Sequence, residues 1–110
     1  MSKALVWFAT RLLFMSQIGD EEALFEETVV LLRAQSESAA QKKALKLGEA
    51  EAHSYQNVDG ETVHWVFKEV LDLIQLDTAS IEDGTEVYHH FLTAAEVDQV
   101  RESLKAGSLA

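Results

Sequence analysis

Apolar side chains in residues 4–15 occupy both the even-numbered and the odd-numbered positions. The even-numbered set comprises Val6, Phe8, Leu12 and Phe14, and the odd-numbered set comprises Leu5, Trp7, Leu13 and Met15. Neighbouring side chains of a strand point to opposite faces, so a strand with two apolar faces must be covered on both. The pattern therefore predicts a buried strand in the middle of a sheet.

Three further segments have the composition of strands. The turn signal at 17–21 leads into the β-rich run 23–34, which predicts a long hairpin with the first strand. Residues 62–76 form the longest candidate, and residues 85–92 predict a shorter return strand. In the 62–76 segment, the apolar residues expected on one face are Val63, Trp65, Phe67, Leu71 and Leu73.

Two helices are expected, one between residues 36 and 55 and one after Thr93. Ser36 or Ser38 can cap the first, and Thr93 with Glu96 has the T-x-x-E spacing of a capping box for the second. Small residues on one face of the first helix would let it lie close to a sheet: Ala40, Ala44 and Gly48. The second helix carries apolar residues at spacings of three and four: Val97, Val100 and Leu104.

Taken in order, these elements predict one α+β domain over residues 1–110 with β-β-α-β-β-α topology. A right-handed crossover through the first helix places strand 62–76 beside strand 4–15, antiparallel to it. The four-stranded antiparallel sheet then has the order 2-1-3-4, with the helices packed on it. This order makes the first and third strands central, in agreement with their apolar character on both faces.

A consequence of this layout is an uncovered apolar face. If both helices pack on one side of the sheet, the first and third strands still present apolar side chains on the other side. Such a surface is larger than monomeric proteins usually expose. We expect either a second copy of the chain to cover it, as in a homodimer, or the C-terminal helix to cross to that face.

The charge of the chain narrows the classes of partner. Nineteen acidic residues against nine basic ones give a net charge of -10, which opposes binding to nucleic acid or to anionic membranes. Because few basic residues flank Trp7 and Trp65, core packing is favoured over base stacking for this pair. Arg11 interrupts the apolar run near the N-terminus, so we expect neither export nor a membrane span, and a cytoplasmic location. Cysteine is absent, which fits a reducing compartment.

Four segments resemble, in order and spacing, a bacterial domain-of-unknown-function family, number 4288. They are WFATRLLF, FEETVVLLRAQSESAA, NVDGETVHWVFKEVLDL and EDGTEVYHHFL. The likeness covers most of residues 6–92. It implies a small α+β domain of bacterial origin, and it implies no activity, cofactor or catalytic residue.

The segment EVYHHFL places His89 and His90 side by side, which raises the question of a metal site. In a strand, adjacent side chains point to opposite faces, so the two histidines cannot bind one ion together. His89 is expected to pack beside Val87 and Phe91. We therefore predict strand residues here, with no metal site, no cofactor and no catalytic residue.

The remaining candidate site is a charged group on the strands. If the first hairpin turns near Gly19, Arg11 lies opposite Glu27, and Glu69 of the third strand could approach Arg11 from the other side. One interpretation is a structural cross-strand ion pair. The other is a ligand-binding cleft whose floor is formed by Arg11, Glu27 and Glu69. The ion pair is the favoured interpretation.

These observations favour a non-enzymatic protein–protein interaction module that self-associates. One alternative is an acidic antidote or immunity-type protein that neutralises a basic partner, and it is marked by salt-sensitive binding. Another is a small enzyme or ligand binder, whose mark is a pocket of several hundred Å³ opening onto Arg11, Glu27 and Glu69.

Overall fold

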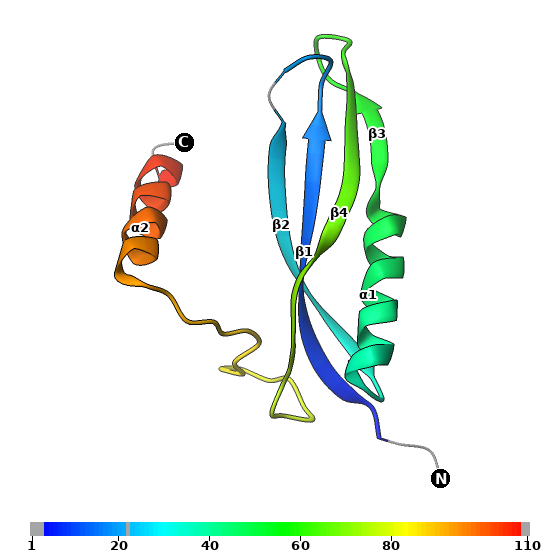
Figure 1. The fold of residues 1–110 in the computed structure, drawn as a ribbon, viewed down its shortest axis with the longest axis vertical. Helices are drawn as coiled ribbons and strands as arrows, with labels where there is room; N and C mark the ends of the chain where they lie inside the picture. The colour runs from blue at the N-terminus through cyan, green and yellow to red at the C-terminus, as the bar shows by residue number, and fades with distance from the viewer. Residues whose placement is uncertain (1–3, 22, 109–110) are drawn as a thin grey trace.

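A computed structural model describes residues 4–21 and 23–108 of the chain (Figure 1). Two strands precede each helix, in the order β1, β2, α1, β3, β4, α2. Their bounds are Val6–Gln17 for β1, Leu24–Ala34 for β2, Glu37–Glu51 for α1, His53–Gln56 for β3, Thr62–Gln75 for β4 and Ala94–Ser108 for α2. Neither described helix is long and apolar enough to cross a lipid bilayer.

The strands form one antiparallel sheet in the order β2-β1-β4-β3. The sequence-based prediction of an α+β fold with a four-stranded antiparallel sheet is confirmed. The placement of the 62–75 strand directly beside the first strand, with β2 on the outer side, is also confirmed. The hairpin pairs Arg11 with Val29 rather than with Glu27, because its register is offset from the one expected for a turn centred on Gly19.

The outermost strand is not the predicted one. Residues 85–92 form no strand, and the edge position beside β4 is taken by β3, most of which lies in the segment predicted to be helical. The Asn57 side chain explains this local pairing: its Oδ1 accepts hydrogen bonds from the backbone N–H groups of Asp59 and Glu61, each at 3.0 Å. The 57–61 loop joins β3 to β4. Closing this loop costs less chain entropy than closing the longer 77–84 connection, which would be needed to pair residues 85–92 with β4.

Helix α1 packs on one face of the sheet through small residues (Figure 1). Of the two predicted caps, Ser36 is the one used, because its Oγ accepts the Ala39 N–H at 3.1 Å. Ala40 and Ala44 are fully buried. The core between helix and sheet contains Phe8, Leu12, Phe14, Leu32 and Ala34.

Two irregularities in the β1–β4 pairing change which residues of β4 face α1. The register shifts between Arg11 and Leu12 and again between Leu13 and Phe14. As a result Val70, together with Trp65 and Phe67, packs against the core under α1. The predicted uninterrupted alternation through Leu71 is therefore wrong. Trp7 and Trp65 also lie on opposite faces, since Trp65 pairs with Ser16 of the buried face.

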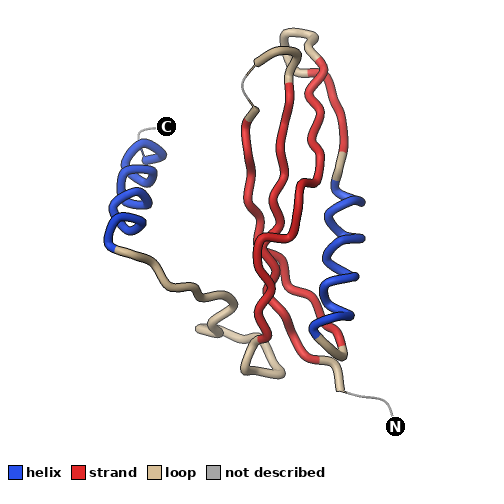
Figure 2. The backbone as a smooth tube through the Cα atoms, viewed as in Figure 1, coloured by secondary structure: helices blue, strands red, loops and turns tan. Residues whose placement is uncertain are grey.

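Helix α2 stands apart from the sheet and from α1. Its predicted capping box is confirmed: the Glu96 N–H donates to Thr93 Oγ1 at 3.2 Å, and the Thr93 N–H donates to Glu96 Oε1 at 3.1 Å. Within the described chain, however, α2 contacts no other helix or strand. Figure 2 shows a long irregular connection between β4 and α2. The prediction that both helices pack on the sheet is thus correct for α1 alone.

Gly48 marks the closest approach of α1 to the sheet and provides a test of this packing. A Cβ atom at this position would lie 2.5 Å from a ring carbon of Phe67. Alanine is intrinsically better than glycine in a helix by about 1 kcal/mol, but overpacking costs about 1–3 kcal/mol. We therefore expect Gly48→Ala to lower the free energy of unfolding, measured by urea denaturation.

The matched control is the same substitution in a Phe67→Ala background. Removing the ring removes the clash, so Gly48→Ala should become neutral or stabilising there. If Gly48→Ala were equally destabilising in both backgrounds, contact with Phe67 would not be the reason for glycine at this position.

Candidate functional site

The sheet face opposite α1, called the open face below, is organised in rows that run across β2, β1 and β4. Paired residues of neighbouring strands present their side chains on the same face. The central member of each row is an odd-numbered residue of β1. The rows are Phe25–Met15–Val66, Glu27–Leu13–Glu69, Val29–Arg11–Asp72 and Leu31–Ala9–Ile74.

Arg11 and Glu27 form a bidentate ion pair on this face. Arg11 Nε donates to Glu27 Oε1 at 2.8 Å, and Nη2 donates to Oε2 at 2.7 Å. The two residues lie in adjacent rows, so the guanidinium reaches Glu27 diagonally across the hairpin. Its hydrogen bonds hold the pKa of the Glu27 carboxyl below its usual value, as expected for a carboxylate beside a fixed cation. The predicted ion pair is therefore present.

Glu69 does not complete this group. It lies across Leu13 from Glu27, is exposed, and makes no ion pair with Arg11 in the described structure. The irregular register of β4 places Asp72, rather than Glu69, directly beside Arg11. Two of the three predicted residues, Arg11 and Glu27, are thus in contact, and Glu69 forms no ion pair with Arg11 in the part of the chain that the structure describes.

Asp72 and Tyr88 are members of the group that the sequence analysis did not identify. Tyr88 Oη donates to Asp72 Oδ2 at 2.7 Å, which lowers the pKa of Asp72. Arg11 Cζ lies 5.6 Å from the centre of the Tyr88 ring. Burial, followed by the bond to Asp72, raises the pKa of Tyr88. The one available signal was an aspartate within the apolar run VLDLIQ, because a carboxylate in such a strand needs a partner.

The histidine pair lies on the connection between β4 and α2 rather than on a strand. His89 is exposed, with Nδ1 at 3.8 Å from Glu86 Oε2, and the Tyr88 and His90 rings are 5.4 Å apart. Phe91 is 95% exposed, so the predicted packing of His89 beside Phe91 is wrong. In the parts of the chain that the structure describes, no three histidine, aspartate or glutamate side chains gather around a common point.

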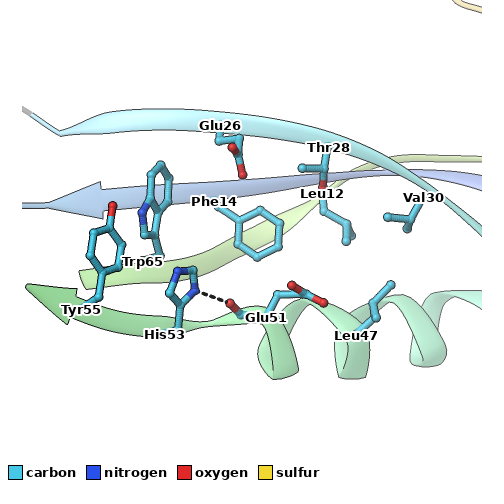
Figure 3. Close-up of a pocket in the computed structure, with 10 residues that line it drawn as sticks. All are labelled: Leu12, Phe14, Glu26, Thr28, Val30, Leu47, Glu51, His53, Tyr55 and Trp65. Atoms are coloured by element: carbon cyan, nitrogen blue, oxygen red, sulfur yellow. Dashed lines mark hydrogen bonds between the residues drawn. The ribbon is translucent and has the colours of Figure 1, made fainter. Parts of the chain in front are cut away.

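A pocket of about 470 Å³ lies on the other face of the sheet, beside α1 (Figure 3). Its walls come from all four strands and from α1. Arg11, Glu27 and Glu69 are not among the residues that line it. The ligand-binding role suggested for those three residues stays a prediction.

Comparison with known protein families shows the family to which the chain belongs. A family model described as Domain of unknown function (DUF4288) matches residues 7–89. The chain belongs to the DUF4288 family. The match confirms the resemblance noted in the sequence. Its range extends from the second residue of β1 through β4 to beyond Tyr88 and ends before α2. No curated protein and no solved structure matches the chain.

The lowered pKa of Glu27 predicts how acid affects the stability of this DUF4288 domain. A carboxyl whose pKa is lower in the folded state stabilises the fold above its unfolded pKa, near 4.5, and that contribution is lost as the pH falls through the folded pKa. Because Glu27 is 42% exposed, Arg11→Gln should lower the free energy of unfolding at neutral pH by only about 0.5–1 kcal/mol. The part of this difference that comes from Glu27 should be lost in acid, leaving only that of the Arg11 contact with the Tyr88 ring, so the difference from the unmodified protein should shrink in denaturation at a series of pH values.

Arg33→Gln is the matched control. Arg33 lies 5.1 Å from the Trp7 ring, a contact that involves no titrating carboxylate. Its effect should be independent of pH over the acid range. If Arg11→Gln lowered the free energy of unfolding equally at neutral and at acid pH, Arg11 would not stabilise the ionised carboxylate of Glu27.

Proposed function

We propose that this chain is a non-enzymatic protein–protein interaction module that self-associates as a symmetric pair, each copy placing its α2 on the open face of the other. The observation that carries the proposal is α2 itself: a capped helix that contacts no other helix or strand of its own described chain.

An isolated helix of this kind lacks a source of stability. Helix α2 has 15 residues, and helices of about this length are marginal in water without tertiary packing. Val97, Val100 and Leu104 lie on one side of it, and Leu104 is 68% exposed. Burial of that apolar side against a partner would supply the missing stabilisation.

The open face offers a complementary surface in the row Phe25–Met15–Val66. Phe25 is 56% exposed and Val66 is 40% exposed. The same chain therefore carries an uncovered apolar helix and an uncovered apolar row. Two copies related by a two-fold axis can bury both pairs of surfaces at once, which is the commonest arrangement of homodimers.

The extended shape of the chain supports a β4–α2 connection that carries α2 away from its own sheet. The Cα radius of gyration is 17.2 Å, whereas a compact chain of this length has one of about 13 Å. Tyr88 anchors the connection to the sheet at Asp72, and beyond that anchor the chain leads away to α2 (Figure 1). This geometry favours contact with a neighbour over closure onto the same sheet.

The net charge of -10 supports a second candidate, an acidic antidote for a basic protein. The two candidates respond oppositely to salt. Two copies of one acidic chain repel each other, so salt should strengthen self-association by screening. Binding to a cationic partner should instead weaken as the salt concentration rises.

Sedimentation equilibrium over a wide concentration range tests self-association directly. The apparent mass should rise from that of one 12.3 kDa chain to that of two, and the dissociation constant should fall with added salt. Leu104→Asp should weaken association by at least about tenfold, since it places a charge in the buried contact.

Gln99→Asp is the matched control, because it adds the same charge to the side of α2 away from Val97, Val100 and Leu104. It should leave the dissociation constant nearly unchanged. A chain that stays monomeric at every concentration and salt level would rule out the proposal.

A further inference from the structure

The pocket beside α1 has an apolar floor in a place that the helix leaves uncovered. Leu12 and Phe14 of β1 and Trp65 of β4 form this floor. Helix α1 ends at Glu51, and beyond its end the sheet continues without a helix above it (Figure 3). The volume of about 470 Å³ lies in the range of pockets that hold small organic molecules.

The two acidic side chains of this pocket lie on different elements. Glu26 extends from β2 and Glu51 from the end of α1, on opposite walls (Figure 3). The ten lining residues include no lysine and no arginine. Carboxylates on two walls, in a chain with a net charge of -10, create a negative potential that attracts cations and repels anions.

An aromatic wall completes the pocket. His53 Nδ1 donates to the backbone carbonyl oxygen of Glu51 at 2.9 Å, which fixes the orientation of the ring. The His53 ring stacks on Tyr55, with centroids 5.8 Å apart and planes 19° apart. His53 pairs with Trp65 across the β3–β4 hairpin, so the three rings share one face of the sheet.

We infer that this pocket binds a small organic cation, an ammonium group on an apolar body. The ammonium would donate hydrogen bonds to Glu26 and Glu51 and lie against the Trp65 and Tyr55 rings, which attract cations through their faces. The apolar body would lie against the floor formed by Leu12 and Phe14, both of which are buried. The site uses the sheet face opposite the proposed self-association surface, so the two proposals are independent.

Titration of the full-length protein with phenethylammonium tests the inference, followed through the two tryptophan indole N–H signals in NMR spectra. Trp65 lines the pocket, whereas Trp7 lies on the open face. The Trp65 signal should shift and saturate while the Trp7 signal stays in place, the two being assigned with a Trp7→Phe variant. Neutral phenethyl alcohol should bind at least about tenfold more weakly, and anionic hydrocinnamate should not bind.

Carboxylate variants locate the contact. Glu26→Gln and Glu51→Gln should each weaken phenethylammonium binding several-fold, and both residues are exposed, so the fold should tolerate the changes. Glu49→Gln, on α1 but outside the pocket, is the control and should bind as the unmodified protein does. Equal affinity for amine and alcohol, a Trp7 shift as large as that of Trp65, or no loss in either pocket variant would overturn the inference.

Discussion

The structure depends on the double pairing of β1. This strand is hydrogen-bonded to β2 along one edge and to β4 along the other, and Phe8 and Leu12 are almost completely buried beneath α1. Because both neighbours take their register from β1, its odd-numbered residues define the rows of the open face. Its even-numbered residues define the floor on which α1 packs and beside which the pocket opens.

The bulged register of β4 decides which charged groups meet. A regular strand would keep one parity on each face, but the two shifts opposite Arg11–Leu12 and Leu13–Phe14 interrupt it. Asp72 is thereby placed beside Arg11 and within reach of the Tyr88 hydroxyl, and Glu69 is left exposed. The anchoring of the β4–α2 connection to the sheet thus follows from a local irregularity of a single strand.

The parts of the fold that sequence patterns predicted are those governed by local or strongly periodic signals. Apolar residues at both even-numbered and odd-numbered positions of β1 indicated its central place in the sheet. The small residues of α1 indicated close packing of that helix on the sheet, and Thr93 with Glu96 indicated the start of α2. The four residues of β3 are polar and exposed, so no hydrophobic pattern marks them as a strand. The bulges of β4 have no signature in an apolar run such as VLDLIQ, and an unbroken alternation places Glu69, rather than Asp72, on the face of Arg11.

The two faces of the sheet support different kinds of recognition. The open face combines an apolar row with the Arg11–Glu27 pair, and its proposed occupant is the α2 helix of a second copy. The pocket beside α1 combines aromatic rings with the carboxylates of Glu26 and Glu51, and its inferred occupant is a small cation. Both depend on surfaces that α1, which covers only part of one face, leaves uncovered.

Amide hydrogen exchange at two protein concentrations tests most directly whether β1 organises the fold while α2 depends on a neighbour. At a concentration where the chain is monomeric, β1 amides should exchange slowest and α2 amides should exchange almost freely. At a concentration where it is paired, α2 should become protected while β1 changes little. Protection of α2 equal to that of β1 in the monomer would contradict this, because the helix would then be stabilised within its own chain.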